Sequence, residues 1–432
     1  MMSRIVSRAM ASLILLAVLL PARVAAQTRC DPGDRVCLQL RHIASDSRVR
    51  SAFRFIEEAE PRTHADHILL TQIPAPPFQE QERARKYAEL LRDAGADSVW
   101  LDEVGNVLAL RRGRARGRTV ALAGHLDTVF PAGTDVTVRQ RGDTLFAPGI
   151  ADDTRGLVLV LTALRALQAA GIRTDADVLF IGTVGEEGLG DLRGVKHLFR
   201  QGGPRIDALI AVDGGGDEEV TNQALGSRRY RLEYRGPGGH SWGAFGTANP
   251  LHALGRAIAL FDEAAAAFTA SGPRTSYNVG RTGGGASVNA IPSTGWIEVD
   301  MRSESPASLQ RIDSIFRGVA ARALELENAG AKKGELTMDL RLVGDRPSGE
   351  TDARSPLVQR ALAAVRHFGG EPRLRRSSTD ANYPISLGVP AITVGRGGVD
   401  GLTHAPGEWW LNRNGAAGIQ RVLLLVLAEA GL

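Results

Sequence analysis

Five short motifs of this 432-residue chain place carboxylate and imidazole side chains beside glycines. In chain order they are Gly124-His125-Leu126-Asp127, Gly149-Ile150-Ala151-Asp152-Asp153, Gly185-Glu186-Glu187-Gly188, Asp213-Gly214-Gly215 and Gly401-Leu402-Thr403-His404. Taken singly, each has an ordinary structural interpretation as a hydrogen-bonded surface pair, a helix N-cap or a solvated turn. Taken together, imidazole nitrogens and carboxylate oxygens form a ligand set that suits zinc, with manganese or cobalt as alternatives.

The apolar runs of the chain predict where these motifs lie. Runs typical of buried strands occupy residues 118–123, 177–184, 207–212 and 391–394, and a helical pattern covers residues 155–170. This alternation predicts an α/β fold with a mostly parallel sheet, and four of the motifs follow its strands. The carboxyl ends of parallel strands meet at one edge of a sheet. So many acids at one edge repel one another unless cations lie among them, and two metal ions would account for their number.

A different order of elements begins near residue 225. Strands are expected at 230–234, 275–280, 286–302 and 336–343, and helices at 250–267 and 308–326. The order βαββαβ predicts a ferredoxin-like unit that is large enough to be a separate domain. We therefore expect one domain, residues 225–346, inserted between the two parts of another, residues 27–224 and 347–432.

In this order, the motifs resemble those of the co-catalytic dizinc peptidases and deacylases. That family includes glutamate carboxypeptidase, tripeptide aminopeptidase (peptidase T), acetylornithine deacetylase and succinyl-diaminopimelate desuccinylase. Two motifs of the inserted domain, Gly238-Gly239-His240 and the run from Gly283 to Pro292, also fit the family pattern. The resemblance implies a metallopeptidase or related amidohydrolase with a zinc-peptidase type catalytic domain. The inserted domain would then be its lid and dimerisation domain.

The resemblance also implies roles for individual residues. His125 and Asp213 would bind one zinc ion, Glu187 and His404 the other, and Asp152 both. Glu186 would be the general base that takes a proton from the zinc-bound water and delivers it to the leaving nitrogen. Asp127 would hold the His125 imidazole in its metal-binding tautomer, and Glu408 would do the same for His404.

Three residues of the lid receive roles from the same resemblance. His240 would reach the active site of the partner subunit in a homodimer and stabilise the oxyanion there. Asn289 and Arg302 would hold the substrate, which often carries a carboxylate. Many relatives have Asp-x-Lys-Gly where this chain has Asp153-Thr154-Arg155-Gly156, so any role of that lysine is lost or passes to Arg155. An Asp at position 213, rather than Glu, leans toward peptide substrates.

Short peptides are thus the expected substrates, and an N-acyl amino acid deacylase of the same family is the alternative. A catalytically inactive secreted module that binds peptides is a reading of a different class, but every expected ligand and Glu186 are present. The run Gly239-His240-Ser241-Trp242-Gly243 fits the Gly-x-Ser-x-Gly pattern of serine hydrolases. Its context is wrong for that motif, because no helical pattern begins directly after Ser241.

Charge and composition limit the partners. The chain has 43% hydrophobic residues and a net charge of +4, values typical of a soluble globular protein. Residues 1–26 hold three arginines, no acid and a short apolar run before Val24-Ala25-Ala26, which predicts a cleaved signal peptide. Cleavage would remove most of the net charge together with the apolar run, so no nucleic-acid partner and no stable membrane span are expected. An uncleaved segment that stays as a membrane anchor is the alternative. We expect an exported protein, periplasmic or secreted, in which Cys30 and Cys37 form a local disulfide.

Overall fold

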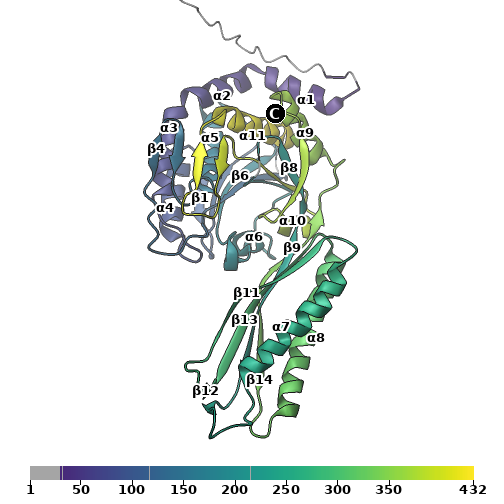
Figure 1. The fold of residues 1–432 in the computed structure, drawn as a ribbon. Helices are drawn as coiled ribbons and strands as arrows, with labels where there is room; N and C mark the ends of the chain where they lie inside the picture. The colour runs from purple at the N-terminus through teal and green to yellow at the C-terminus, as the bar shows by residue number, and fades with distance from the viewer. Residues whose placement is uncertain (1–29, 32, 116, 215) are drawn as a thin grey trace, which may run out of the picture.

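The computed structural model describes residues 30–432 apart from residues 32, 116 and 215. The expected signal peptide, residues 1–26, lies outside the described residues. Figure 1 shows a large α/β part and, below it, an elongated second part made of one sheet with two long helices along it. Cys30 and Cys37 form the expected disulfide, at the start of the described chain.

The large part is built on a nine-stranded sheet whose centre is parallel. The central order is β6-β3-β7-β17, with β6 Asp177–Thr183, β3 Thr119–His125, β7 Ala208–Val212 and β17 Ala391–Val394. On one side follow the antiparallel strands β2 Val107–Arg111 and β1 Ser98–Leu101. On the other lie β8 Glu219–Ala224, β15 Gly349–Glu350 and β16 Arg373–Ser377. The parallel pairs bring the ends of β3, β6 and β7 to one edge of the sheet.

One expectation about this sheet is wrong. The arginine-rich segment at residues 111–117 reads from sequence as a hairpin turn between two neighbouring strands. Strands β2 and β3 instead lie on opposite sides of β6, which pairs antiparallel with β2 and parallel with β3. The apolar strand β6 is more deeply buried when flanked on both sides, and it therefore takes the central place between them.

Helices cover both faces of the sheet, because alternate strand residues point to opposite sides. The larger core joins Val120, Leu122 and Phe180 to the helices α1 to α5, α9 and α11. Their bounds are α1 Arg35–Ser45, α2 Ser47–Glu58, α3 Glu60–Thr71, α4 Gln81–Asp93, α5 Thr154–Ala169, α9 Pro356–His367 and α11 Gly415–Ala430. Ala121 and Ile181 face a smaller core under α6 Arg193–Leu198 and α10 Asn382–Ser386. The helix α5, whose side chains are nearly all buried, places its N-terminus beside the edge where the motifs gather.

A second, small sheet joins two distant segments at that edge. Its order is β18-β19-β5-β4, with β18 Val399–Gly401, β19 Trp409–Leu411, β5 Thr144–Phe146 and β4 Arg139–Arg141. Trp410 pairs with Leu145 and is buried with Ile150. This pairing holds the loop that carries His404 against the loop that carries Asp152.

The second part, called the lid here, runs from β9 to β14. Its elements are β9 Gly226–Arg235, α7 Pro250–Thr269, β11 Thr275–Gly284, β13 Thr294–Ser303, α8 Pro306–Gly330 and β14 Thr337–Arg346. The four strands are antiparallel in the order β11-β13-β9-β14, and both helices pack on one face around Phe261 and Phe316. This is the ferredoxin-like arrangement. The expected fold class, a mostly parallel α/β domain with such a domain inserted, is confirmed.

Two very short strands, β10 Gly239–His240 and β12 Ala290–Ile291, pair with each other. Figure 1 places β12 at the end of the lid farthest from the α/β part. Among the described helices, none is long and apolar enough to cross a membrane.

Candidate metal centre

Asp152 lies between the two predicted histidine ligands. Its Oδ1 is 3.0 Å from Nε2 of His125, and its Oδ2 is 3.2 Å from Nε2 of His404. His125 is the last residue of β3 and is buried, whereas the side chain of His404 is 51% exposed. A single carboxylate therefore faces two imidazoles, as the bridging role predicted for Asp152 requires.

The other two predicted ligands complete the cluster. Glu187, which follows β6, has Oε1 2.8 Å from Nε2 of His404. Asp213, which follows β7, offers a carboxylate oxygen within 4.8 Å of ligand atoms of His125 and Glu186. A second such group joins His125, Asp152 and Glu187. The sequence-predicted ligands thus come together at one edge of the sheet.

The protonation of the cluster shows that it suits cations. Burial, followed by the negative charge of Asp152, raises the pKa of Asp213 to about 8. Burial also raises the pKa of Glu186 to about 8, although the positive charge of Arg346 lowers it by more than the negative charge of Glu187 raises it. A raised pKa means that too little positive charge surrounds these buried carboxyl groups to stabilise their ionised form. A divalent cation bound among them would supply that charge. The donor set, two imidazoles and three carboxylates, fits two zinc ions.

Asp127 acts on this cluster mainly through the main chain. Its two carboxylate oxygens accept hydrogen bonds from the N–H groups of Glu186 and Glu187, at 3.0 and 2.8 Å. Nδ1 of His125 lies 3.0 Å from the carbonyl oxygen of Asp127 and 3.7 Å from its carboxylate. The carbonyl is therefore the group at hydrogen-bond distance from the imidazole, and the carboxylate orients the turn that carries Glu186 and Glu187.

Glu408 has a different contact from the one expected. It does not hold the His404 imidazole: its carboxylate accepts hydrogen bonds from the N–H groups of Gly149, Ala151 and Asp152, at 3.2, 2.8 and 2.9 Å. Strand β19 follows Glu408 directly and pairs with β5, which directs the side chain into the loop after β5. Glu408 thus fixes the loop of the bridging carboxylate.

Two buried arginines at the site have no sequence motif. Arg346, the last residue of β14, donates to Oε1 of Glu186 at 2.9 Å and also to its carbonyl oxygen. Arg396, just after β17, lies 3.2 Å from Oδ1 of Asp152 and 3.3 Å from Oδ1 of Asp153. Arg346 ends its strand and Arg396 lies two residues beyond one, but no local pattern in the sequence shows which carboxylate each arginine contacts.

Arg155 does not take over a role at the metal ligands. Its guanidinium donates to the carbonyl oxygens of Arg396 and Gly415, at 3.1 and 2.9 Å, and stacks over the ring of Trp410. It is buried and acts on the site only by holding the main chain at Arg396.

A cavity of about 440 Å³ opens beside the cluster. Asp152, Glu186, Glu187, Asp213 and His404 line one side of it, and Arg229, Arg302 and Arg346 of the lid strands line the other.

The lid wall of this cavity is a pair of arginines that share one carboxylate. Asp300 accepts from Nε of Arg229 and from Nε of Arg302, both at 2.8 Å. Although burial opposes it, these hydrogen bonds lower the pKa of Asp300, which stays ionised. Two guanidinium groups and one carboxylate leave this wall with a positive charge. Arg302 therefore lies where the predicted substrate-holding role requires.

His240 and Asn289 are not at this cavity. His240 belongs to β10 and pairs with Ala290 of β12. Asn289 directly precedes β12, and its carbonyl oxygen accepts from the N–H of Ser241 at 2.9 Å. The structure brings these two predicted residues together with each other but not with the metal ligands of their own chain.

Known proteins share this arrangement. The model of peptidase family M20/M25/M40 matches residues 121–428. A Pyrococcus abyssi protein named as a LysW-lysine/LysW-ornithine hydrolase is 27% identical over an alignment of 357 residues that covers 78% of this chain and 86% of that protein. A Mycobacterium tuberculosis protein named as succinyl-diaminopimelate desuccinylase is also 27% identical, over 78% of this chain and 90% of its own length. Carboxypeptidase G2 of a Pseudomonas species is 24% identical over 66% of this chain and 68% of that enzyme.

Solved structures show the same fold. The aminopeptidase PepT of Bacillus cereus has a TM-score of 0.67 at 21% identity and covers 86% of this chain and 99% of its own. The yeast dipeptidase Dug1p has a TM-score of 0.69 at 16% identity, over 88% of this chain and 98% of its own. The family match spans most of the chain, from β3 to α11, and every predicted metal ligand lies within it. The chain therefore belongs to peptidase family M20/M25/M40 and is a metal-dependent hydrolase of that family.

Proposed function

We propose that this protein is an exported dizinc peptidase that hydrolyses short peptides. The observation that carries the proposal is the position of Asp152 between His125 and His404, with Glu187 beside it. His125 and Asp213 would hold one zinc ion, Glu187 and His404 the other, and Asp152 both. When bound, the two ions polarise the scissile carbonyl and lower the pKa of water.

The reaction also needs a group that moves protons, and Glu186 is placed for this. It lines the cavity next to the ligand Glu187, and its burial gives its carboxyl a pKa of about 8. Metal ions bound beside it would lower this pKa, so that the carboxylate could accept a proton from water and release it to an amine near neutral pH. The Arg346 guanidinium and the Asp127 carboxylate hold the Glu186 side chain and main chain in this position.

The lid wall of the cavity supports a substrate with a carboxylate, such as the C-terminus of a short peptide. The guanidinium groups of Arg302 and Arg229 share Asp300 and keep further N–H donors for an anionic group. An N-acyl amino acid also carries a carboxylate, so the deacylase alternative uses the same wall. The peptidase and the deacylase differ in the amide bond that they cut: the peptidase cuts the bond between two amino acids, and the deacylase cuts the bond between the acyl group and the amino acid.

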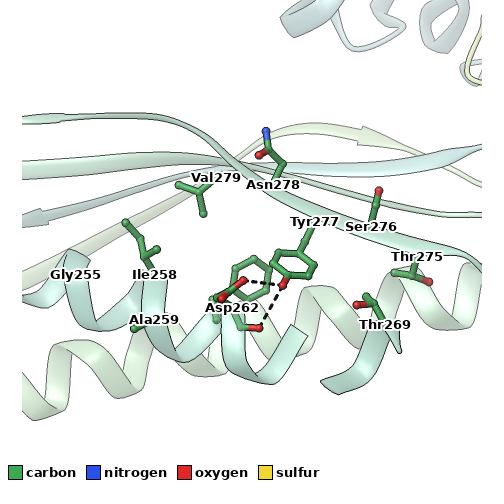
Figure 2. Close-up of a pocket in the computed structure, with 11 residues that line it drawn as sticks. Gly255, Ile258, Ala259, Asp262, Thr269, Thr275, Ser276, Tyr277, Asn278 and Val279 are labelled. Carbon is green, nitrogen blue, oxygen red and sulfur yellow. Dashed lines mark hydrogen bonds between the residues drawn. The ribbon is translucent and has the colours of Figure 1, made fainter. Parts of the chain in front are cut away.

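We further propose that the protein works as a homodimer, in which His240 reaches the partner's cavity. Two observations support this: His240 lies away from its own cavity, and β11 is an edge strand of the lid sheet. A groove of about 680 Å³ runs between β11 and α7, with Ile258, Phe261, Tyr277 and Val279 among its lining residues. Figure 2 shows Tyr277 of β11 bonded across this groove to Asp262 of α7. A second copy placed along β11 would cover it.

Export is supported by the disulfide between Cys30 and Cys37, since such bonds persist in oxidising compartments. The proposed signal peptide ends a few residues before this bond, so the mature chain would begin at Gln27 and start with a closed loop.

The experiment that tests the function is a cleavage screen of the mature protein loaded with zinc, manganese or cobalt. Free, N-acetylated and C-amidated di- and tripeptides are compared, with and without a chelator. We expect release of amino acids that the chelator abolishes and that C-amidation weakens. Cleavage of acyl groups but not of any peptide would favour the deacylase, and no cleavage with two metals bound would favour the inactive binding module.

A further inference from the structure

Two side chains from distant segments hold the loop that carries Asp152. The carboxylate of Glu408 accepts hydrogen bonds from the N–H groups of Gly149, Ala151 and Asp152. Nε2 of His67 lies 2.5 Å from the carbonyl oxygen of Ile150. His67 belongs to α3, which precedes the residues matched by the family model.

The surroundings of His67 decide how it interacts. Its side chain has no solvent exposure, and its ring packs edge-on against Trp410 with the centroids 5.0 Å apart. Burial, followed by the positive charge of Arg155, lowers the pKa of His67 to about 3, so the imidazole is neutral. A carbonyl oxygen only accepts, and Nε2 must therefore carry the proton and donate it.

The contact does more than fill space. Ile150 is buried, so without His67 its carbonyl oxygen would lose its hydrogen-bond donor away from water, which is unfavourable. Loops respond to that cost by turning the peptide group toward another donor or toward water. Ile150 is two residues before Asp152, so a rotation of its peptide group would move the carboxylate that faces both histidines.

We propose that His67 is a positioning residue for the metal centre, which it serves by holding Asp152 in place through the Ile150 carbonyl. This inference rests on the metal centre proposed above. It makes helix α3 a part of the site, because His67 of α3 packs with Trp410 and contacts the loop that carries Asp152.

The test compares four variants of the full mature chain. His67→Gln keeps an N–H donor near the place of Nε2, and His67→Asn has its amide near the place of Nδ1, too short to reach Ile150. His67→Leu keeps the volume without a donor. The matched control is Thr63→Val on the same helix, which loses the buried contact of its hydroxyl with that of Thr162, at 3.3 Å, but does not touch the loop.

The measurements are the affinities for Co²⁺ and Zn²⁺ in competition with a chelating dye, the visible spectrum of the cobalt protein, and kcat and KM. We expect His67→Leu and His67→Asn to lose about 10–100-fold in the affinity for at least one ion, as when partners of metal ligands are removed. Their cobalt spectrum should change and kcat should fall more than KM rises. His67→Gln should regain most of the affinity, and Thr63→Val should keep it.

The inference is overturned if His67→Asn binds Co²⁺ as the parent does, with the same spectrum. It is also overturned if His67→Gln binds Co²⁺ as poorly as His67→Asn does. That result would show that the site needs the shape of the imidazole ring and not its N–H donor. If His67→Leu fails to fold, the comparison of Gln with Asn decides. Failure of the parent protein itself to bind metal would instead refute the proposed function.

Discussion

Glu186 is the residue whose substitution best separates metal binding from proton transfer. It lines the cavity beside Glu187 but is not needed as a ligand in the proposed set. Glu186→Gln should keep two metals per chain and lower kcat by at least about 100-fold, because the amide cannot take up the proton. Metal content by elemental analysis and kcat on the best dipeptide measure this. Full activity would show that another group moves the proton.

The ligands themselves give the opposite pattern. Asp152→Asn should reduce the bound metal to one ion per chain or fewer, because one oxygen of the pair that faces His125 and His404 is replaced by an amide nitrogen. Activity should fall in proportion to metal content. Asp135→Asn is a matched control, since that aspartate is exposed and lies outside the cavity. Two tightly bound metals in Asp152→Asn would refute the bridging role.

The buried His67 makes a prediction about acid stability. The pKa of His67 falls from 6.5 to about 3 on folding, so between these values only the unfolded chain binds the proton. Stability is then lost as the pH falls below 6.5, by at most about 1.4 kcal/mol per pH unit from this residue.

Denaturant unfolding of metal-free protein at pH 6.5, 5.5 and 4.5 measures that loss. The free energy of unfolding of His67→Gln should fall less steeply than that of the parent, since every other titrating group is common to both. Parallel curves would mean that His67 is protonated in the folded protein.

At the level of single residues, the sequence was sufficient to predict that the proposed ligands gather at one sheet edge, and insufficient to predict the side chains that contact them. His125 ends an apolar strand, Asp213 directly follows one and Glu187 lies four residues beyond one, and that pattern places them at one sheet edge. Arg346, Arg396 and His67 act through contacts between segments far apart in the chain, for which the sequence holds no local pattern. The true contact of Glu408 depends likewise on the pairing of β19 with β5.

Among the elements, long apolar strands and amphipathic helices were predictable, and short polar strands were not. Strand β16, Arg-Leu-Arg-Arg-Ser, is exposed throughout and exists because it pairs with β8. The small sheet is built from strands of three residues, too short for a period to show. The place of β6 between β2 and β3 also follows from tertiary packing rather than from chain order.

Two lid strands carry the proposed carboxylate-binding wall, and Asp300 of β13 links them. Asp300→Asn should release Arg229 on β9 and Arg302 on β13 from their common partner. We expect KM for peptides with a free C-terminus to rise about 10-fold, equal to about 1.4 kcal/mol, with kcat less affected.

C-amidated peptides should show no such change, because they lack the carboxylate. Arg281→Gln on β11 is the control, since its exposed ion pair with Glu298 lies outside the cavity. Equal effects on free and amidated peptides would place the substrate carboxylate elsewhere.

For the whole molecule, the proposed homodimer predicts rescue between two inactive proteins. His240→Ala and Glu186→Gln proteins are mixed and allowed to exchange subunits. A mixed dimer then holds one site with an intact Glu186 from one chain and an intact His240 from the other. Random exchange would restore about a quarter of the parent's sites. No recovery after exchange proven by mass spectrometry would mean that His240 does not act across the dimer.

The position of β17 has a consequence for how the protein is made. This strand, residues 391–394, lies between β7 and β8, which end at residues 212 and 224. A growing chain must therefore leave a gap at the centre of its main sheet until nearly nine-tenths of it has been synthesised. The lid is complete in sequence at residue 346 and its four strands pair only with one another, so it can fold first. During that interval the unpaired edges of β7 and β8 are the segments most exposed to aggregation, and His404, the last ligand, is joined to the site only after they have paired.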